Sequence, residues 1–337
     1  MNLNIYKMPL SGSMNNEYRS FLLECGLRDE EDADLSVLIT DDEGLIMACG
    51  SLAGNTIKQL AVASEAEGQG VMAEVLSALI SEAASRGIFR LFLCTKPANS
   101  RMFGSMGFYE IVSTEDAVLM ENRKDGIRRF LDSVPRHEGV CGAVVCNCDP
   151  FTLGHRHLIR HAAENCDSLY VFAVSEAGSM FTPEERLDMI RKGTADIPNC
   201  HVYESNMYLI SRATFPAYFI KDTAKAEAVK ADLDIELFAG RIAPALGITK
   251  RFAGQEPADE VTREYNKRMS EILPAKGIDF EEIPRLTDDE GAAVSAGRVR
   301  SLIRQISGTG NKADSEILQQ ISKMVPETTY EVILKHI

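Results

Sequence analysis

The chain has 337 residues, more than a single hydrophobic core usually organises, and this length indicates two domains. Its formal net charge of −14 argues against non-specific binding to nucleic acid or anionic lipid, so neither is an expected partner. The sequence has no apolar run long enough to span a membrane and opens without signal-peptide features, which predicts a cytoplasmic protein without a membrane partner. Its eight scattered cysteines are expected to be reduced thiols that pack as small hydrophobic side chains.

Residues 1–122 are predicted to form a first α/β domain. A turn containing Gly44 joins two apolar runs, 37–40 and 45–49, and this pattern predicts a β-hairpin. The further elements, in chain order, are a strand at 56–62, a helix at 71–86, a strand at 89–94, a short helix at 100–106 and a last strand from 107 to 111.

The segment Gly68-Gln69-Gly70 opens the main helix of this domain. The order of elements, this segment and the later Phe103–Phe108 stretch resemble the GNAT acetyltransferase family. In that family the strand–loop–helix holds the pyrophosphate of a coenzyme A-type ligand on backbone amides, and Gly68 and Gly70 are its implied binding residues here. The family has Arg or Gln three residues before the first glycine, where this chain has Glu65. The alternative is a non-catalytic domain that binds a coenzyme A-like group or merely packs.

Residues 123–138 are predicted to be a linker, because charged and turn-forming residues are dense there, with a short helix near 127–131. From 139 to 337 strands and helices alternate, which predicts a Rossmann-like, doubly wound parallel sheet. The strands are expected at 140–146, 169–174, 200–204, 235–239, 251–254 and 279–283. The helices are expected at 157–164, 183–192, 215–230, 261–273 and 299–306.

The segment from Asn147 to His155 links the first of these strands to its helix. At the carboxyl end of a parallel strand, such a connection presents backbone N–H groups and a helix dipole to an anion. Thr152 and His155 add a hydroxyl and an imidazole beside that place, and Gly154 lets a backbone or a phosphate come close. The alternative for His155 is an ordinary helix-capping or core histidine. His157 is expected to face away, and His161 to lie on the surface.

The motif Thr152-Leu-Gly-His155, after Asn147-Cys-Asp-Pro-Phe151, resembles the T/H-x-G-H signature of the nucleotidyltransferase superfamily. The resemblance implies attack of a substrate anion on the α-phosphorus of a nucleoside triphosphate, with release of pyrophosphate. It assigns His155 and Thr152 to the phosphoryl oxygens as charge builds. It also places the rest of the ATP-binding segment at Asn147, Pro150, Phe151 and Gly154.

A second motif lies about 140 residues later, where Ser295 and Arg300 match the superfamily pattern I-S-x-x-x-[IV]-[RK]. The serine and following amides would face the β- and γ-phosphates, and Arg300 would add positive charge. Gly297 stands where relatives often have Ser or Thr, so Arg298 either compensates or is a solvated charge. Arg186 is left open between a structural role and a contact with phosphate.

Nearly the whole chain resembles the citrate lyase ligase family. The segments that add to the two motifs are 181–190, 208–222, 251–257 and 261–266. The resemblance implies an acid–thiol ligase that forms acetyl-AMP from ATP and acetate and releases AMP and pyrophosphate. The acceptor would be the thiol of a phosphoribosyl-dephospho-coenzyme A group on the acyl carrier subunit of citrate lyase. Mg²⁺ would be held mainly by phosphate oxygens and water.

Two other functions stay open from the sequence. One is an adenylyltransferase of coenzyme synthesis, which joins AMP to a phosphate-bearing substrate and stops there. The other is a binding protein that senses acetyl-coenzyme A without turning over ATP. The partner of the acetate carboxylate is also undecided among Lys221, Arg212 and Arg241.

Overall fold

The computed structural model describes residues 1–174, 179–206, 208–209, 217–257, 259–306 and 312–337. The chain divides into two compact units, Met1–Arg128 with Thr214–Glu236, and Arg129–Ala213 with Leu237–Ile337. The predicted boundaries at 122 and 139 stay a prediction, but residues 217–236, expected in the second domain, pack with the first unit. Across the described residues, no helix combines the length and the apolar character needed to cross a membrane.

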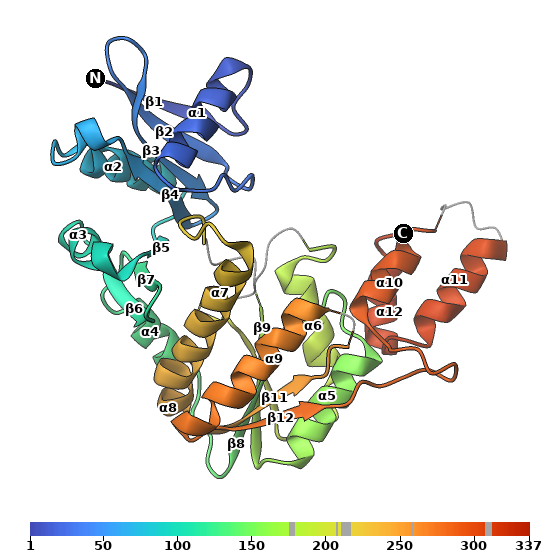
Figure 1. The fold of residues 1–337 in the computed structure, drawn as a ribbon. Helices are drawn as coiled ribbons and strands as arrows, with labels where there is room; N and C mark the ends of the chain where they lie inside the picture. The colour runs from blue at the N-terminus through green and yellow to red at the C-terminus, as the bar shows by residue number, and fades with distance from the viewer. Residues whose placement is uncertain (175–178, 207, 210–216, 258, 307–311) are drawn as a thin grey trace. The chain divides into compact units, whose positions relative to one another are not determined.

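The first unit is built on a seven-stranded sheet with the order β1-β2-β3-β4-β5-β7-β6 (Figure 1). Its strands are β1 (Asn2–Lys7), β2 (Leu35–Thr40), β3 (Ile46–Ala53), β4 (Thr56–Val62), β5 (Phe92–Thr95), β6 (Tyr109–Ser113) and β7 (Val118–Glu121). Its helices include α1 (Ser13–Glu24), α2 (Val71–Ser85) and α3 (Ser100–Ser105). The hairpin β2–β3, strand β4 and helix α2 confirm the predictions, while the predicted last strand is the start of a β6–β7 hairpin.

Helix α2 lies close against the sheet because a glycine faces it. Val75 and Leu79 of α2 are fully buried, and a Cβ on Gly50 of β3 would lie within 3 Å of both side chains. The absence of that Cβ lets the apolar face of the helix pack directly on the strand, where burial of each such side chain contributes about 1.5–3 kcal/mol. This contact forms the centre of the first core.

The parallel strands β4 and β5 pair through two residues each, Thr56 with Phe92 and Ile57 with Leu93, although β4 continues to Val62. Tyr218 packs beyond this short pairing and is 4% exposed. Its hydroxyl accepts a hydrogen bond from the backbone of Leu60. Tyr218 therefore explains why its segment clusters with the first unit.

Arg28 holds the same segment through the backbone. Its own N–H donates to the Tyr218 carbonyl at 2.8 Å, and its guanidinium donates to the Ala217 carbonyl at 3.1 Å. Farther along, Lys225 pairs with Asp116 at 2.7 Å. The helix that follows, α7 (Thr223–Leu237), begins later than the predicted helix at 215–230, whose residues 215 and 216 lie outside the described residues.

The second unit contains a five-stranded, fully parallel sheet with the order β10-β9-β8-β11-β12, as expected for a Rossmann-like fold. Its strands are β8 (Cys141–Cys146), β9 (Ser168–Ala173), β10 (Cys200–Glu204), β11 (Ile248–Gly254) and β12 (Asp279–Ile283). The helices are α4 (Gly126–Ser133, shared with the first unit), α5 (Leu153–Glu164), α6 (Pro183–Gly193), α8 (Ala243–Leu246), α9 (Glu260–Ile272), α10 (Ala296–Ile303), α11 (Lys312–Ser322) and α12 (Glu327–Ile333).

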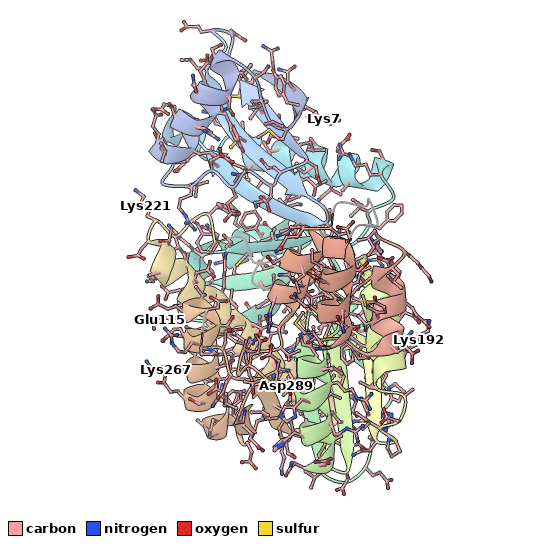
Figure 2. All side chains as sticks on the ribbon, turned by 90° about the vertical axis from the view of Figure 1, so that its right-hand side faces the viewer. Lys7, Glu115, Lys192, Lys221, Lys267 and Asp289 are labelled. Carbon is pink, nitrogen blue, oxygen red and sulfur yellow. The ribbon has the colours of Figure 1, made fainter. Side chains whose placement is uncertain are left out.

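The step from β8 to β9 and the step from β11 to β12 run in opposite directions along the sheet. Right-handed crossovers therefore place α5 and α9 on opposite faces, which is the doubly wound arrangement. Lys192 of α6 and Lys267 of α9 project from this unit into solvent (Figure 2). The direction reverses between β8 and β11, which is where open α/β sheets bind ligands.

Three expectations for this unit need correction. The strand predicted at 235–239 is wrong, because these residues end α7 and form a π-helix, Phe238–Ile242. A short apolar run cannot distinguish a strand from a buried helix, and Leu237 and Phe238 are buried in the helical form. The helices α11 and α12 were not anticipated. Helix α5 also begins at Leu153, four residues before its predicted start.

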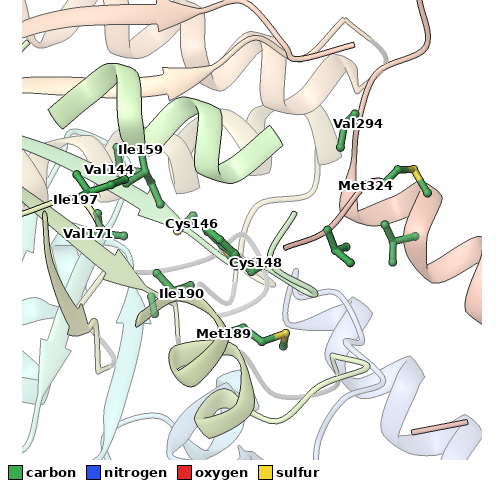
Figure 3. Close-up of a cluster of buried hydrophobic side chains, with 14 of the residues drawn as sticks. Val144, Cys146, Cys148, Ile159, Val171, Met189, Ile190, Ile197, Val294 and Met324 are labelled. Carbon is green, nitrogen blue, oxygen red and sulfur yellow. The ribbon is translucent and has the colours of Figure 1, made fainter. Parts of the chain in front are cut away.

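The second core lies between α5, α6 and the carboxyl-terminal helices. Figure 3 shows Cys146 and Cys148 side by side with Met189 and Ile190 of α6, while Val294 and Met324 approach from the last part of the chain. All eight cysteines of the protein are free thiols, as predicted. The segment after β8 is thus held by apolar side chains that pack into this core.

Removing the hydroxyl of Tyr218 should destabilise the first unit. In Tyr218→Phe the backbone donor of Leu60 loses its buried acceptor, so the free energy of unfolding should fall by about 1–3 kcal/mol. Tyr109→Phe, at a side chain that is 41% exposed, is the matched control and should be nearly neutral. Urea unfolding followed by circular dichroism measures both, and equal stability of the two variants would contradict the buried contact.

Candidate active site

A cavity of about 520 Å³ opens at the carboxyl ends of β8, β11 and β12. Four segments line it: the β8–α5 connection with the first turn of α5, the residues after β11, the residues after β12, and the amino end of α10. Its polar lining includes Asn147, Asp149, Thr152, His155, His157, Gln255, Glu256, Thr262, Arg285, Ser295 and Arg300. Two motifs about 140 residues apart in sequence therefore share one cavity.

Thr152 and His155 cap α5 reciprocally. The Thr152 hydroxyl accepts from the His155 N–H at 3.3 Å, and His155 Nδ1 accepts from the Thr152 N–H at 3.1 Å. A backbone N–H can only donate, so Nδ1 is the unprotonated nitrogen of the neutral ring. The proton then sits on Nε2, which makes the imidazole a hydrogen-bond donor through its outer nitrogen. His155 is a capping histidine, and its capping fixes the tautomer.

The pKa of His155 is lowered from 6.5 to about 4. Burial is the main cause, because it disfavours the charged ring, and the positive charges of Arg285 and Arg300 add to it. His155 is consequently neutral at pH 7. It can donate one hydrogen bond to a phosphoryl oxygen, while the arginines carry the positive charge.

Gly154 brings α5 and α10 together. A Cβ at this position would lie 2.5 Å from the carbonyl oxygen of Val294, the residue that precedes the N-cap of α10. Ser295 caps α10 by accepting from the Arg298 N–H at 3.3 Å. The predicted close approach at Gly154 is thus to backbone. Because both helices begin at this contact, their free N–H groups open toward the same cavity.

Arg300 and Arg298 have different partners. The Arg300 guanidinium donates to the Asp149 carbonyl oxygen and lies 3.6 Å from the Asp149 carboxylate, and Arg300 lines the cavity. Arg298 is paired with Asp288 and lies outside the lining. The pairing with Arg298 holds the pKa of Asp288 below its usual value. Of the two arginines, Arg300 is the one placed to meet a ligand.

Phe151 and Pro150 lie on the buried side of the β8–α5 connection. Both are buried, and neither contributes to the cavity lining. The Phe151 ring is fully buried against Gly193 and stacks on the His155 ring with a centroid distance of 5.9 Å. Their assignment to ATP binding stays a prediction, and their contacts explain how His155 is held.

Arg186 is fully buried and donates to both the backbone and the side-chain oxygen of Asn147. Of the two roles considered for Arg186, these contacts favour the structural one, because the guanidinium fixes the backbone directly after β8. Asn147 itself lines the cavity, and its assignment to ATP binding stays a prediction.

The remaining sequence candidates are dispersed. His157 lines the cavity, which corrects its expected orientation away from the site, whereas His161 is a surface residue as predicted and pairs with Glu281 at 2.7 Å. Among the acetate candidates, Arg241 and Lys221 are exposed and absent from the lining, and Arg212 lies outside the described residues.

Gly68 and Gly70 belong to the first unit. Both have positive φ, 75° and 82°, and Gly70 is the N-cap of α2. Both are exposed, and a Cβ on either would meet no described atom within 4 Å. The loop therefore leaves the amino end of α2 open to solvent, as an anion site would require.

Sequence reasoning missed Asp149, Glu256 and Arg285. The Asp149 carboxylate accepts from the backbone N–H groups of Met180 and Phe181, at 3.1 and 3.0 Å, and thereby ties the β8–α5 connection to the residues before α6. Asp149 stands inside the first motif, so its position was a usable signal. Glu256 and Arg285 carry no such local signal, because only the parallel order of β11 and β12 brings them to the cavity.

The parallel sheet and the cavity at its reversal point are those of a nucleotidyltransferase-like domain, and the first unit has the GNAT fold. Residues 141–333 match the family model of the citrate lyase ligase C-terminal domain, and residues 10–110 match that of the acetyltransferase (GNAT) family. The chain belongs to the citrate lyase ligase family.

Curated relatives match along most of the chain. Proteins named citrate (pro-3S)-lyase ligase from Klebsiella pneumoniae and Escherichia coli (strain K12) are 39% and 40% identical to it, and each match covers 85% of this chain. The matches cover 85% and 84% of those relatives. A protein of the same name from Haemophilus influenzae is 36% identical over 94% of both chains.

The low pKa of His155 predicts how acid affects stability. The imidazole titrates near 6.5 in the unfolded chain and near 4 in the folded protein, so the unfolded state binds more protons between these values. The stability that the neutral ring contributes is complete above pH 6.5 and is lost as the pH falls toward 4. The unfolding free energy should decrease more steeply over this range in the wild type than in His155→Gln.

His157→Gln, at an exposed side chain of the same helix, is the matched control. Nuclear magnetic resonance of the imidazole C–H groups gives a direct measurement, with an expected midpoint for His155 of about 4. A midpoint near 6.5 would contradict the proposed neutral donor.

Proposed function

We propose that this protein uses ATP to activate acetate as acetyl-AMP and transfers the acetyl group to the prosthetic-group thiol on the acyl carrier subunit of citrate lyase. Membership of the citrate lyase ligase family supports this reaction. The observation that carries it is the convergence of two helix amino ends, Arg300 and a neutral His155 on one cavity. Such a set of donors suits a polyphosphate within a protein whose net charge is −14.

In the first step an acetate oxygen attacks the α-phosphorus, the bond from that phosphorus to the bridging oxygen breaks, and pyrophosphate leaves. His155 Nε2 donates to an α-phosphoryl oxygen, where negative charge grows in the transition state. The amino end of α10, with Ser295 as its cap, and Arg300 hold the β- and γ-phosphates. Mg²⁺, when bound with the triphosphate, would be held mainly by phosphate oxygens and water and would neutralise part of the phosphate charge.

In the second step the thiol sulfur attacks the acyl carbon of acetyl-AMP, the thiol proton is released, and AMP leaves as the new thioester forms. Nothing in this step requires charge on His155, so the imidazole can keep its proton on Nε2 throughout. We propose that the Gly68–Gly70 loop holds the coenzyme A-like arm of the carrier, because its exposed amides at the start of α2 suit a pyrophosphate.

The adenylyltransferase and sensor alternatives differ in measurable ways. The proposed reaction requires exchange of labelled pyrophosphate into ATP that depends on acetate, followed by acetyl transfer to a thiol-bearing carrier protein. An adenylyltransferase of coenzyme synthesis would show exchange that depends on a phosphate-bearing substrate. A sensor would bind acetyl-coenzyme A without any exchange. The cytoplasmic location stays a prediction.

Removing the His155 donor should slow the first step. His155→Ala should lower acetate-dependent exchange by about 10²-fold or more, the scale for loss of a preorganised hydrogen-bond donor. His161→Ala, at a surface histidine of the same helix, is the control and should keep near-normal exchange. Near-normal turnover of His155→Ala would count against the role assigned to the imidazole.

Altering the glycine loop should affect the second step alone. Gly68→Ala strains a φ of 75° and adds a methyl group to the exposed loop where the arm would bind. It should therefore raise the KM for the carrier protein and leave acetate-dependent exchange intact. Gly44→Ala strains a φ of 89° in the β2–β3 turn and controls for backbone strain in the same unit. An unchanged KM in Gly68→Ala would remove the first unit from carrier binding.

A further inference from the structure

Arg285 enters the cavity from the carboxyl end of β12. Its Nε donates to the Gln255 carbonyl oxygen at 2.6 Å, and its Nη2 pairs with the Glu256 carboxylate. All three residues line the cavity. Among the residues that the structure describes, Nη1 has no hydrogen-bond partner, so this edge of the guanidinium can meet a ligand. These two contacts fix the plane of the guanidinium and leave Nη1 available to a ligand.

Arg285 and Arg300 line the same cavity as His155 from different loops. Both positive charges also lower the pKa of His155. Arg300 is anchored on Asp149 after β8, and Arg285 is anchored on residues after β11, the neighbouring strand. The two guanidinium groups are therefore held by different loops of the cavity.

The α10 side of the cavity has the helix amino ends and the positive charge that suit a polyphosphate. The amino ends of α5 and α10 meet there, and Arg300 adds a positive charge beside them. Arg285 stands outside this group. An anion that attacks the α-phosphorus must approach opposite the leaving pyrophosphate and against the repulsion of the triphosphate. A guanidinium that lines the same cavity and is held by the residues after β11, as Arg285 is, offsets that repulsion.

The side chain of Arg285 suits a carboxylate. A guanidinium is planar and can form paired hydrogen bonds with the two oxygens of a carboxylate. In Arg285, Nη2 already makes a single contact with the Glu256 carboxylate. The Arg285 side chain is 26% exposed, and partial burial strengthens a charged contact relative to bulk water. Burial lowers the pKa of Arg285, but an arginine remains charged near neutral pH.

We propose that Arg285 binds the carboxylate of the acid substrate and orients one of its oxygens toward the α-phosphorus beside His155. This inference rests on the proposed activation of acetate and names the residue that holds the acid. Of the candidates considered from the sequence, Lys221 and Arg241 are absent from the lining, and Arg212 lies outside the described residues.

The test compares two Michaelis constants in the acetate-dependent pyrophosphate exchange assay. In Arg285→Gln the KM for acetate should rise about tenfold or more, as expected for loss of a charged hydrogen bond, while the KM for ATP should stay within about twofold of the wild type. Arg285→Lys keeps the positive charge but loses the paired N–H donors. Its KM for acetate should lie between those of the wild type and Arg285→Gln. Arg160→Gln, at a 45% exposed arginine of α5, is the control and should change neither constant.

A rise in the KM for ATP equal to that for acetate would overturn the proposal, because Arg285 would then be a triphosphate ligand. Unchanged constants would also overturn it. A second measurement needs no variant: acetate should protect Arg285 of the wild-type protein from phenylglyoxal, followed by peptide mass spectrometry, and failure of acetate to protect would reject the assignment. If the wild type shows no acetate-dependent exchange, the proposed function fails, and the protection experiment still decides whether Arg285 binds carboxylate.

Discussion

The contact between Gly154 and the Val294 carbonyl is the constraint on which the site depends. Any side chain at Gly154 would collide with that backbone, so the residue is what allows α5 and α10 to begin at one place. The C-terminal helices reinforce the contact, because the first N–H of α5 donates to the Met324 carbonyl at 2.9 Å. An anion in the cavity therefore meets the amino ends of two helices held in fixed relation.

The charge distribution of the site follows from this geometry. Capping uses His155 Nδ1, burial keeps the ring neutral, and Phe151 supports the ring from below. The positive charge is left to Arg285 and Arg300, whose side chains are anchored on separate loops. A neutral donor that shares a cavity with two permanent cations can donate to an anion without changing its own protonation near neutral pH, because its pKa lies well below 7.

The two compact units are connected by more than one stretch of chain. The segment 217–236 lies between β10 and β11 in sequence, yet Tyr218 and α7 pack with the N-terminal unit. Arg28 and Leu60 supply the backbone contacts that hold Tyr218. A segment from within the sequence of the nucleotidyltransferase-like domain thus packs as part of the GNAT-like unit. A substitution of Tyr218 is therefore expected to change the stability of the first unit, although the position of Tyr218 in the sequence suggests the second.

Local patterns were sufficient for the parallel sheet and for the two motifs that share the cavity, since the ends of strands and the residues that follow them are close in sequence. They failed for 235–239, where an apolar run fits a strand or a buried helix equally well, and for α11 and α12. They also could not reveal Arg285 beside His155, or assign Arg298 to Asp288 rather than to a ligand. Those placements depend on which strands become neighbours and which helix ends converge, and only the packing of the whole unit determines that.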